Sequence, residues 1–239
     1  MDTYITQQQY SQIKNYCLDL LLPLSCLLCH QHCHHPLSIC SACQKLIRPP
    51  MTVSQIEYAA NNDSKQIPYW QSIRCLCAYE SPIKELILMG KFEKNLAALK
   101  ALGSLFSDVI LAQGYDPDLV LIPVPLHHDR LLERGFNQAL EIALPIAKKL
   151  HLKIDNHCVY RAIAAKTQHF LTRKERKNNA RNIFQVKRPI AKKVALIDDV
   201  FTTGATMQSL CYCLQDAGVE IIEVWIIART LKQSSGILT

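Results

Sequence analysis

Two adjacent carboxylates and a hydroxyl-rich turn stand together in the segment KVALIDDVFTTGATM, residues 193–207. Its first part, Val194–Ile197, has the apolar, β-branched character of a buried strand. Asp198 and Asp199 follow where that strand is expected to end, and a helical pattern begins after residue 206. The turn between them consists of Thr202, Thr203, Gly204, Ala205 and Thr206.

This order of residues suits a phosphorylated sugar. Free N–H groups and the positive end of the dipole at a helix start attract phosphate. Gly204 lets the backbone approach an anion closely, and the threonine hydroxyls add neutral donors. The carboxylates of Asp198 and Asp199 can accept hydrogen bonds from ribose hydroxyls or hold a hydrated Mg²⁺. The sequence therefore predicts a sugar-phosphate site at the carboxyl end of a strand.

The same segment resembles the motif with which type I phosphoribosyltransferases bind 5-phosphoribosyl 1-pyrophosphate (PRPP). The shared pattern is an apolar strand, two acidic residues, an apolar pair and Thr-Thr-Gly-x-Thr. The resemblance implies that PRPP binds with Mg²⁺ at Asp198, Asp199 and residues 202–206. It does not imply that any group is transferred there.

Four of the chain's 11 cysteines form two CxxC pairs separated by ten residues: Cys26, Cys29, Cys40 and Cys43. Each pair offers two sulfurs from one tight turn, and two pairs complete a tetrahedron around Zn²⁺. A four-thiolate site has no open position, so we expect a structural zinc ion. Between the pairs lie other possible ligands, which leave open an exchange of one ligand: Cys33, His30, His32, His34 and His35.

One stretch of the chain, residues 161–193, carries eleven lysines and arginines against a single acid, Glu175. A solvated helix face usually mixes both signs, so this stretch predicts an anion-binding surface. Arg130 and Arg134 lie four residues apart, and one helical turn would put both on one face. We expect these residues to contact DNA: Arg130, Arg134, Lys166, Arg173, Lys174, Arg176, Lys177 and Arg181. Alternatively, the basic stretch faces the phosphosugar.

The elements that would position these residues alternate along the chain. Buried strands are predicted near residues 73–79, 119–122, 194–197 and 220–228, with another near 158–160. Helices are predicted over 82–92, 94–113 and 137–150. The pattern is typical of an α/β fold with a parallel sheet. We expect residues 1–50 to form an N-terminal helix and zinc module, and residues 51–239 the main domain.

Composition sets wider limits. Apolar residues make up 49% of the chain, and the net charge is +7 with a pI near 8.8, which is only weak support for a polyanionic partner. The apolar run at residues 18–28 is interrupted by Asp19 and Pro23 and is too short to span a bilayer. No transmembrane segment and no convincing export signal are predicted, so we expect a cytoplasmic protein.

Together these segments resemble the ComF family of competence proteins. The resemblance covers the CxxC pairs, residues 84–92, PVPLHHDRLLERGFNQA at 123–139, KTQHFLTRKERKNNARNIF at 166–184 and the PRPP motif. It implies a phosphoribosyltransferase-like core with an added zinc module and a role in the uptake of single-stranded DNA during natural transformation. It also implies that a pyrophosphate loop is formed by Val124, Pro125, Leu126, His127 and Arg130.

Three functions follow as hypotheses. The first is a competence factor that binds single-stranded DNA and carries a PRPP–Mg²⁺ site, with proteins of the uptake apparatus as possible partners. The second is an active phosphoribosyltransferase with an unknown acceptor, for which the sequence identifies no catalytic base. The third is a PRPP-sensing regulator that reads duplex DNA, although no duplex-reading module is visible in the sequence.

Overall fold

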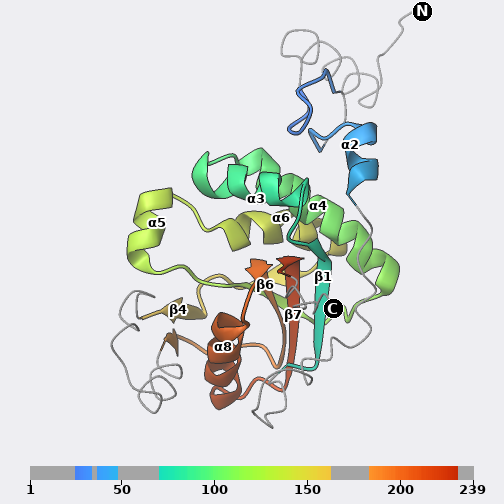
Figure 1. Cartoon of the computed structure of the whole chain (residues 1–239). Coiled ribbons are helices and arrows are strands. Elements are labelled where there is room, and N and C mark those ends of the chain that lie inside the picture. Colours follow the sequence, from blue (N-terminus) through green and yellow to red (C-terminus); the bar gives the residue numbers. More distant parts are fainter. Residues whose placement is uncertain (1–24, 34–36, 48–69, 163–182, 231–239) are drawn as a thin grey trace, which may run out of the picture. The chain divides into compact units, whose positions relative to one another are not determined.

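The computed structural model of the chain describes residues 25–33, 37–47, 70–162 and 183–230 (Figure 1). The chain divides into two units, residues 1–47 and 48–239. The predicted N-terminal helix and the basic residues from Lys166 to Arg181 lie outside the described residues.

A five-stranded parallel sheet forms the centre of the larger unit. Its strands, in spatial order, are β1 (Ser72–Ala78), β7 (Ile221–Arg229), β6 (Lys193–Phe201), β2 (Val120–Pro123) and β3 (Lys153–Ile154). The apolar run Val194–Ile197 in β6 is fully buried, as expected for a strand covered on both faces. The predicted α/β fold with a parallel sheet is confirmed, and β3 is a short strand that the sequence did not reveal.

Helices cover both faces of this sheet (Figure 1). One face carries α3 (Ile83–Phe92), α4 (Leu96–Gln113) and α6 (Gln138–Leu150), and the other carries α8 (Ala205–Asp216). All four match predicted helices, and α8 begins at Ala205, slightly earlier than the helical pattern after residue 206 indicated. Asparagine side chains cap two of them, because Asn95 accepts from Ala98 N and Asn137 accepts from Ala139 N.

A separate antiparallel pair lies beside α8 and consists of β4 (Val159–Arg161) and β5 (Phe184–Val186). The strand predicted near residue 158 therefore exists, but it does not join the main sheet. Ala162 N donates to Ile183 O at 2.8 Å. The chain thus leaves this hairpin at residue 162 and returns at residue 183, at the next position across the pair.

Strand β6 is longer than the sequence suggested. Its pairing with β7 continues past the apolar run, with Asp198 opposite Ile226, Val200 opposite Ala228 and Phe201 opposite Arg229. The expectation that the strand ends before the two acids is corrected, because the ladder with β7 holds them in extended conformation. Side chains alternate between faces along a strand, so Asp198 and Asp199 point to opposite faces of the sheet.

Helix α4 also has the length and hydropathy of a membrane span. In this fold it packs between α3 and α6 and against the sheet. Eight of its residues, among them Leu99, Leu102, Phe106 and Ile110, are buried. A core helix of a globular domain meets the same criteria of length and composition, so these criteria carry little weight for α4.

Candidate functional site

The carboxyl ends of the parallel strands bring the two predicted ligand segments together. Strand β2 ends at Pro123 and β6 ends at Phe201, and both strands run in the same direction. Val124 N donates to Ile197 O at 2.9 Å. The segment that follows β2 therefore begins beside Asp198, at the edge of the sheet where α/β proteins place ligands.

The two carboxylates sit in different surroundings. Asp198 lies on the same face of the sheet as Leu196, which packs in the core cluster that contains residues of α8. Asp199 lies on the face that α3 covers. The Asp199 side chain is only 5% exposed, and its Oδ2 lies 2.9 Å from Lys91 Nζ of α3. Asp199 N also donates to Asp198 Oδ1 at 2.9 Å, which ties the first carboxylate to the backbone of the second.

Asp198 has a strongly perturbed ionisation. Burial raises the pKa of its carboxyl, and the neighbouring Asp199 charge raises it further, to about 7, although Lys91 and Arg161 act in the opposite direction. Burial lowers the pKa of the half-buried Arg161 guanidinium. The charge of Asp198 raises this pKa, and the charge of Arg130 lowers it. The Cζ atom of Arg161 lies 5.6 Å from the centre of the Phe184 ring, within the range of a cation–π contact. The region around Asp198 thus gathers opposite charges in a partly buried space.

The predicted phosphate turn connects β6 to α8. Thr202 and Thr203 are exposed, and Gly204 is the N-cap of α8 with a left-handed φ of 76°. A side chain at that φ would strain the backbone. Ala205 N donates to Thr203 Oγ1 at 3.4 Å. The exposed hydroxyls and the helix N-terminus meet at the same end of β6.

The predicted pyrophosphate loop leads from β2 into α5 (His128–Arg134). Val124 is buried, Pro125, Leu126 and His127 are half-buried, and Arg130 is exposed. His127 Nδ1 accepts from Asp129 N at 3.3 Å and so caps α5. The backbone of His127 forms a bridge with Arg161, which places the start of α5 next to the end of β4.

Two of the predicted DNA-binding residues lie on α5. Arg130 is 3.9 Å from the Glu133 carboxylate and remains exposed. Arg134 is half-buried, and its Nη1 donates to Gln138 Oε1 at 2.7 Å. The remaining six lie outside the described residues: Lys166, Arg173, Lys174, Arg176, Lys177 and Arg181. The segment that contains them is attached at both ends to the β4–β5 pair, next to Arg161.

The sequence did not single out Lys91 or Arg161 as site residues. Arg161 directly follows a predicted strand, and that position was a usable signal. Lys91 lies on a helix far from the acidic pair in the sequence, and only the packing of α3 brings it to Asp199.

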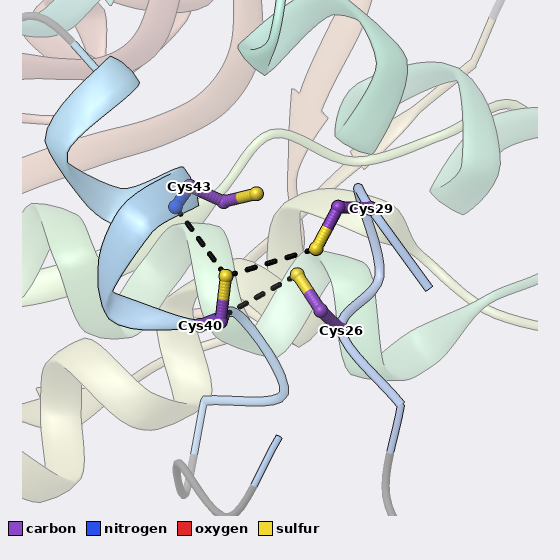
Figure 2. Close-up of side chains that lie close together, drawn as sticks. All are labelled: Cys26, Cys29, Cys40 and Cys43. Carbon is purple, nitrogen blue, oxygen red and sulfur yellow. Dashed lines mark hydrogen bonds between the residues drawn. The ribbon is translucent and has the colours of Figure 1, made fainter. Parts of the chain in front are cut away.

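The smaller unit contains a compact cluster of sulfur atoms. The Sγ atoms of the four predicted ligands, Cys26, Cys29, Cys40 and Cys43, all lie within 4.8 Å of one another (Figure 2). Cys29 and Cys40 are separated by 3.7 Å between sulfurs, close to the roughly 3.8 Å edge of a tetrahedron with Zn–S bonds of about 2.3 Å. This arrangement can hold a zinc ion. Cys33 is buried but does not belong to the cluster.

Local hydrogen bonds shape both halves of this cluster. His30 N donates to Cys26 O, and Cys26 N donates to Gln31 O, which folds the first CxxC pair into a tight turn. The second pair opens α2 (Ser41–Leu46), where the N-cap Cys40 sulfur accepts from Cys43 N at 3.4 Å. Cys40 N in turn donates to the Cys26 sulfur at 3.4 Å. The backbone thus joins the two pairs.

Ionisation of the thiols is uneven. Burial opposes ionisation of Cys26, but the backbone N–H groups of Cys29, Cys40 and Leu28 outweigh it and lower the pKa of this thiol to about 6. Burial and the three neighbouring sulfurs raise the pKa of Cys43 to about 12. Four thiolates therefore require a bound cation, and binding of a metal ion would release protons.

Several named proteins are similar to this chain, although no protein-family model matches it. DNA utilization protein YhgH of Escherichia coli (strain K12) is 31% identical, with 89% of this chain and 100% of that protein covered. Competence protein F of Haemophilus influenzae is 32% identical, with 85% and 96% covered. Competence protein ComFC of Bacillus subtilis (strain 168) is 31% identical over 61% of this chain and 58% of that protein. The first two relatives match nearly the whole chain.

We predict that Asp198→Asn stabilises the protein in a pH-dependent way. The folded-state pKa of about 7 exceeds the ordinary value of 3.8, so wild-type stability falls as pH rises through this interval. The gain from asparagine should be small at pH 4 and complete at pH 8, about 1 kcal/mol or more, which is roughly 2–4 °C in Tm. Thermal denaturation at both pH values measures it. Asp108→Asn, on the exposed side of α4, is the control, and an equal effect of both variants would refute the assignment.

We predict one zinc ion per chain, bound by the four-cysteine cluster. Cys40→Ser should abolish stoichiometric zinc and unfold residues 26–43, because so small a unit has little core of its own. Cys33→Ser, outside the cluster, should retain the metal. Metal analysis of protein purified without chelator measures both variants. Zinc-free wild type, or loss of zinc with Cys33→Ser, would contradict the four-cysteine site.

Proposed function

Because the chain belongs to the ComF family of competence proteins, we propose that it binds single-stranded DNA during DNA uptake and carries a PRPP–Mg²⁺ site. The family relation supports a competence-related function, and the names of its relatives suggest a role with DNA. The proposed setting is the cytoplasm, where proteins of the uptake apparatus would be its partners.

The observation that carries the PRPP proposal is the composition of the carboxyl edge. Two carboxylates, a hydroxyl-bearing turn and the N-terminus of α8 adjoin there, and Lys91 and Arg161 lie on either side of the acids. A phosphorylated sugar needs both sets of groups, since carboxylates accept from ribose hydroxyls and N–H groups bind phosphate. Neither set alone distinguishes this ligand from a simple anion or cation.

In this proposal each group has a separate task. Thr202, Thr203 and the first turn of α8 hold the 5-phosphate. Asp198 accepts from a ribose hydroxyl, and Arg130 and Arg161 attract the pyrophosphate from the side of α5 and β4. Mg²⁺, when bound, would neutralise phosphate charge and orient the pyrophosphate. Asp199 forms an ion pair with Lys91 and so fixes this lysine beside the site.

The DNA proposal depends on the one-signed charge of residues 161–193. Residues 162 and 183, between which six of these basic residues lie, face each other across the β4–β5 pair, and the backbone of Arg161 forms a bridge with His127 at the start of α5. The positive charge would therefore extend from the sheet edge along the segment between residues 162 and 183. Single-stranded DNA presents a continuous line of phosphates that such a surface can follow without reading sequence. Duplex DNA serves as the comparison, because preferential binding of duplex would favour a duplex-reading regulator.

An active phosphoribosyltransferase is the second candidate, and one observation favours it. A carboxyl with a pKa near 7, as at Asp198, is suited to take up a proton from an attacking nucleophile near neutral pH. Release of pyrophosphate from PRPP separates the two functions. A binding protein leaves PRPP intact with or without DNA, whereas a transferase releases pyrophosphate once its acceptor is supplied.

We predict that PRPP binds in the presence of Mg²⁺ and that Thr203→Val weakens this binding. Loss of one hydrogen bond to a charged phosphate costs about 1–3 kcal/mol, which calorimetry can resolve. Asp199→Ala should also weaken binding. Thr230→Val is the matched control, since Thr230 lies beside Phe201 but outside the turn. Equal PRPP affinity in the wild type and both test variants would argue decisively against the site.

We predict that single-stranded DNA binds with little sequence preference and with steep salt dependence. Each neutralised phosphate contributes about −0.7 to the slope of log K against log salt. Arg173→Ala with Arg176→Ala should therefore lower affinity and flatten the slope by up to about 1.4. The control is Lys148→Ala with Lys149→Ala, which removes two positive charges at the exposed end of α6.

The same double arginine variant separates the two roles of the basic stretch when both ligands are titrated. Reduced DNA affinity with unchanged PRPP affinity supports DNA binding by these arginines. An unchanged salt slope with lost PRPP binding would instead assign them to the phosphosugar and remove them from the DNA surface.

A further inference from the structure

One ion pair connects α3 to the acidic pair of the candidate site. Lys91 Nζ lies 2.9 Å from Asp199 Oδ2, and the two side chains are 20% and 5% exposed. A carboxylate so deeply buried is strongly destabilising unless a cation neutralises it. Lys91 supplies that charge in the ligand-free protein.

The fold holds Lys91 in this position from two directions. Lys91 belongs to the last turn of α3, where the partial negative charge of the helix end favours a cation. The preceding residue, Gly90, faces α4 so closely that a Cβ would lie 2.3 Å from Leu99 Cδ2. The missing side chain lets the end of α3 pack on α4, and this packing directs Lys91 to β6.

The ammonium contacts the oxygen atom that a divalent cation would need. Mg²⁺ binds oxygen ligands at short distance, through one or two carboxylates together with phosphates and water. An ammonium 2.9 Å from Asp199 Oδ2 occupies the space next to that oxygen and repels a second cation nearby. Removal of the ammonium should therefore improve metal binding in the absence of any phosphosugar.

We propose that Lys91 is an internal counter-cation that keeps divalent metal ions off Asp199 until a phosphosugar binds. This inference rests on the proposed PRPP site. In the ligand-free state Lys91 and Arg161 balance the charges of Asp198 and Asp199, so a free metal ion gains little electrostatic energy there. A phosphosugar brings several negative charges, to which the ammonium can turn on its flexible stem. Lys91 thereby couples metal binding to phosphosugar binding.

The first test uses Mn²⁺ alone as the probe. Its affinity is measured by electron paramagnetic resonance for the wild type, Lys91→Met and Lys91→Gln. The glutamine variant offers Asp199 a polar N–H group and serves as the second test should the methionine variant fold poorly. Both variants should bind Mn²⁺ about tenfold more tightly, equivalent to about 1.4 kcal/mol of lost competition. Lys84→Met, an exposed lysine of the same helix, should leave the affinity unchanged. Equal Mn²⁺ affinity in the wild type and Lys91→Gln would overturn the proposal.

The second test measures PRPP binding with Mg²⁺ by calorimetry. In the wild type each ligand should strengthen the binding of the other, and in Lys91→Gln this mutual enhancement should shrink. Weaker PRPP binding with unchanged Mn²⁺ affinity would make Lys91 a phosphate ligand only and refute the counter-cation. If the wild type binds no PRPP, the proposed function fails, and the Mn²⁺ comparison still decides whether Lys91 blocks the metal.

Discussion

Two adjacent carboxylates within the central strand impose the main electrostatic constraint on this fold. The ladder with β7 keeps Asp198 and Asp199 extended, so their side chains point to opposite faces of the sheet. Each carboxylate then depends on a different layer for a cation. Lys91 of α3 reaches Asp199 from one side, and Arg161 of β4 acts on Asp198 from the other. The helix α3 and the strand β4 are thereby both positioned at the carboxyl edge of the central sheet.

The smaller unit meets a similar constraint with different means. Backbone N–H groups hold two of its four sulfurs and lower the pKa of Cys26 to about 6. Burial, together with the neighbouring sulfurs, raises the pKa of Cys43 to about 12. Protons therefore balance part of the cluster when no metal is bound. In the sheet a lysine and an arginine neutralise the acids, whereas four thiolates in so small a unit call for an external dication.

The sequence was informative wherever local pattern determines structure. Apolar runs and helical periodicity predicted most of the central sheet and its helices, and the two CxxC pairs predicted the sulfur cluster. Features that depend on a distant partner were missed or misjudged. β6 extends to Phe201 because β7 pairs with it, and Lys91 reaches Asp199 only through the packing of α3. His127, expected in a pyrophosphate loop, uses its imidazole to cap α5, a detail that depends on where the helix begins.

The β4–β5 pair links the two proposed ligands through their charge. Arg161 ends β4 beside Asp198, and the basic segment leaves and re-enters the pair next to it. PRPP and DNA would thus both bind next to the same region of positive potential. Two unit charges 10 Å apart repel by about 0.4 kcal/mol in water, and each ligand carries several such charges. Occupation of one site should therefore weaken the other at low ionic strength, while salt screens the interaction. Such antagonism needs no conformational change, because repulsion between two negatively charged ligands bound on either side of Arg161 and Arg130 is sufficient to produce it.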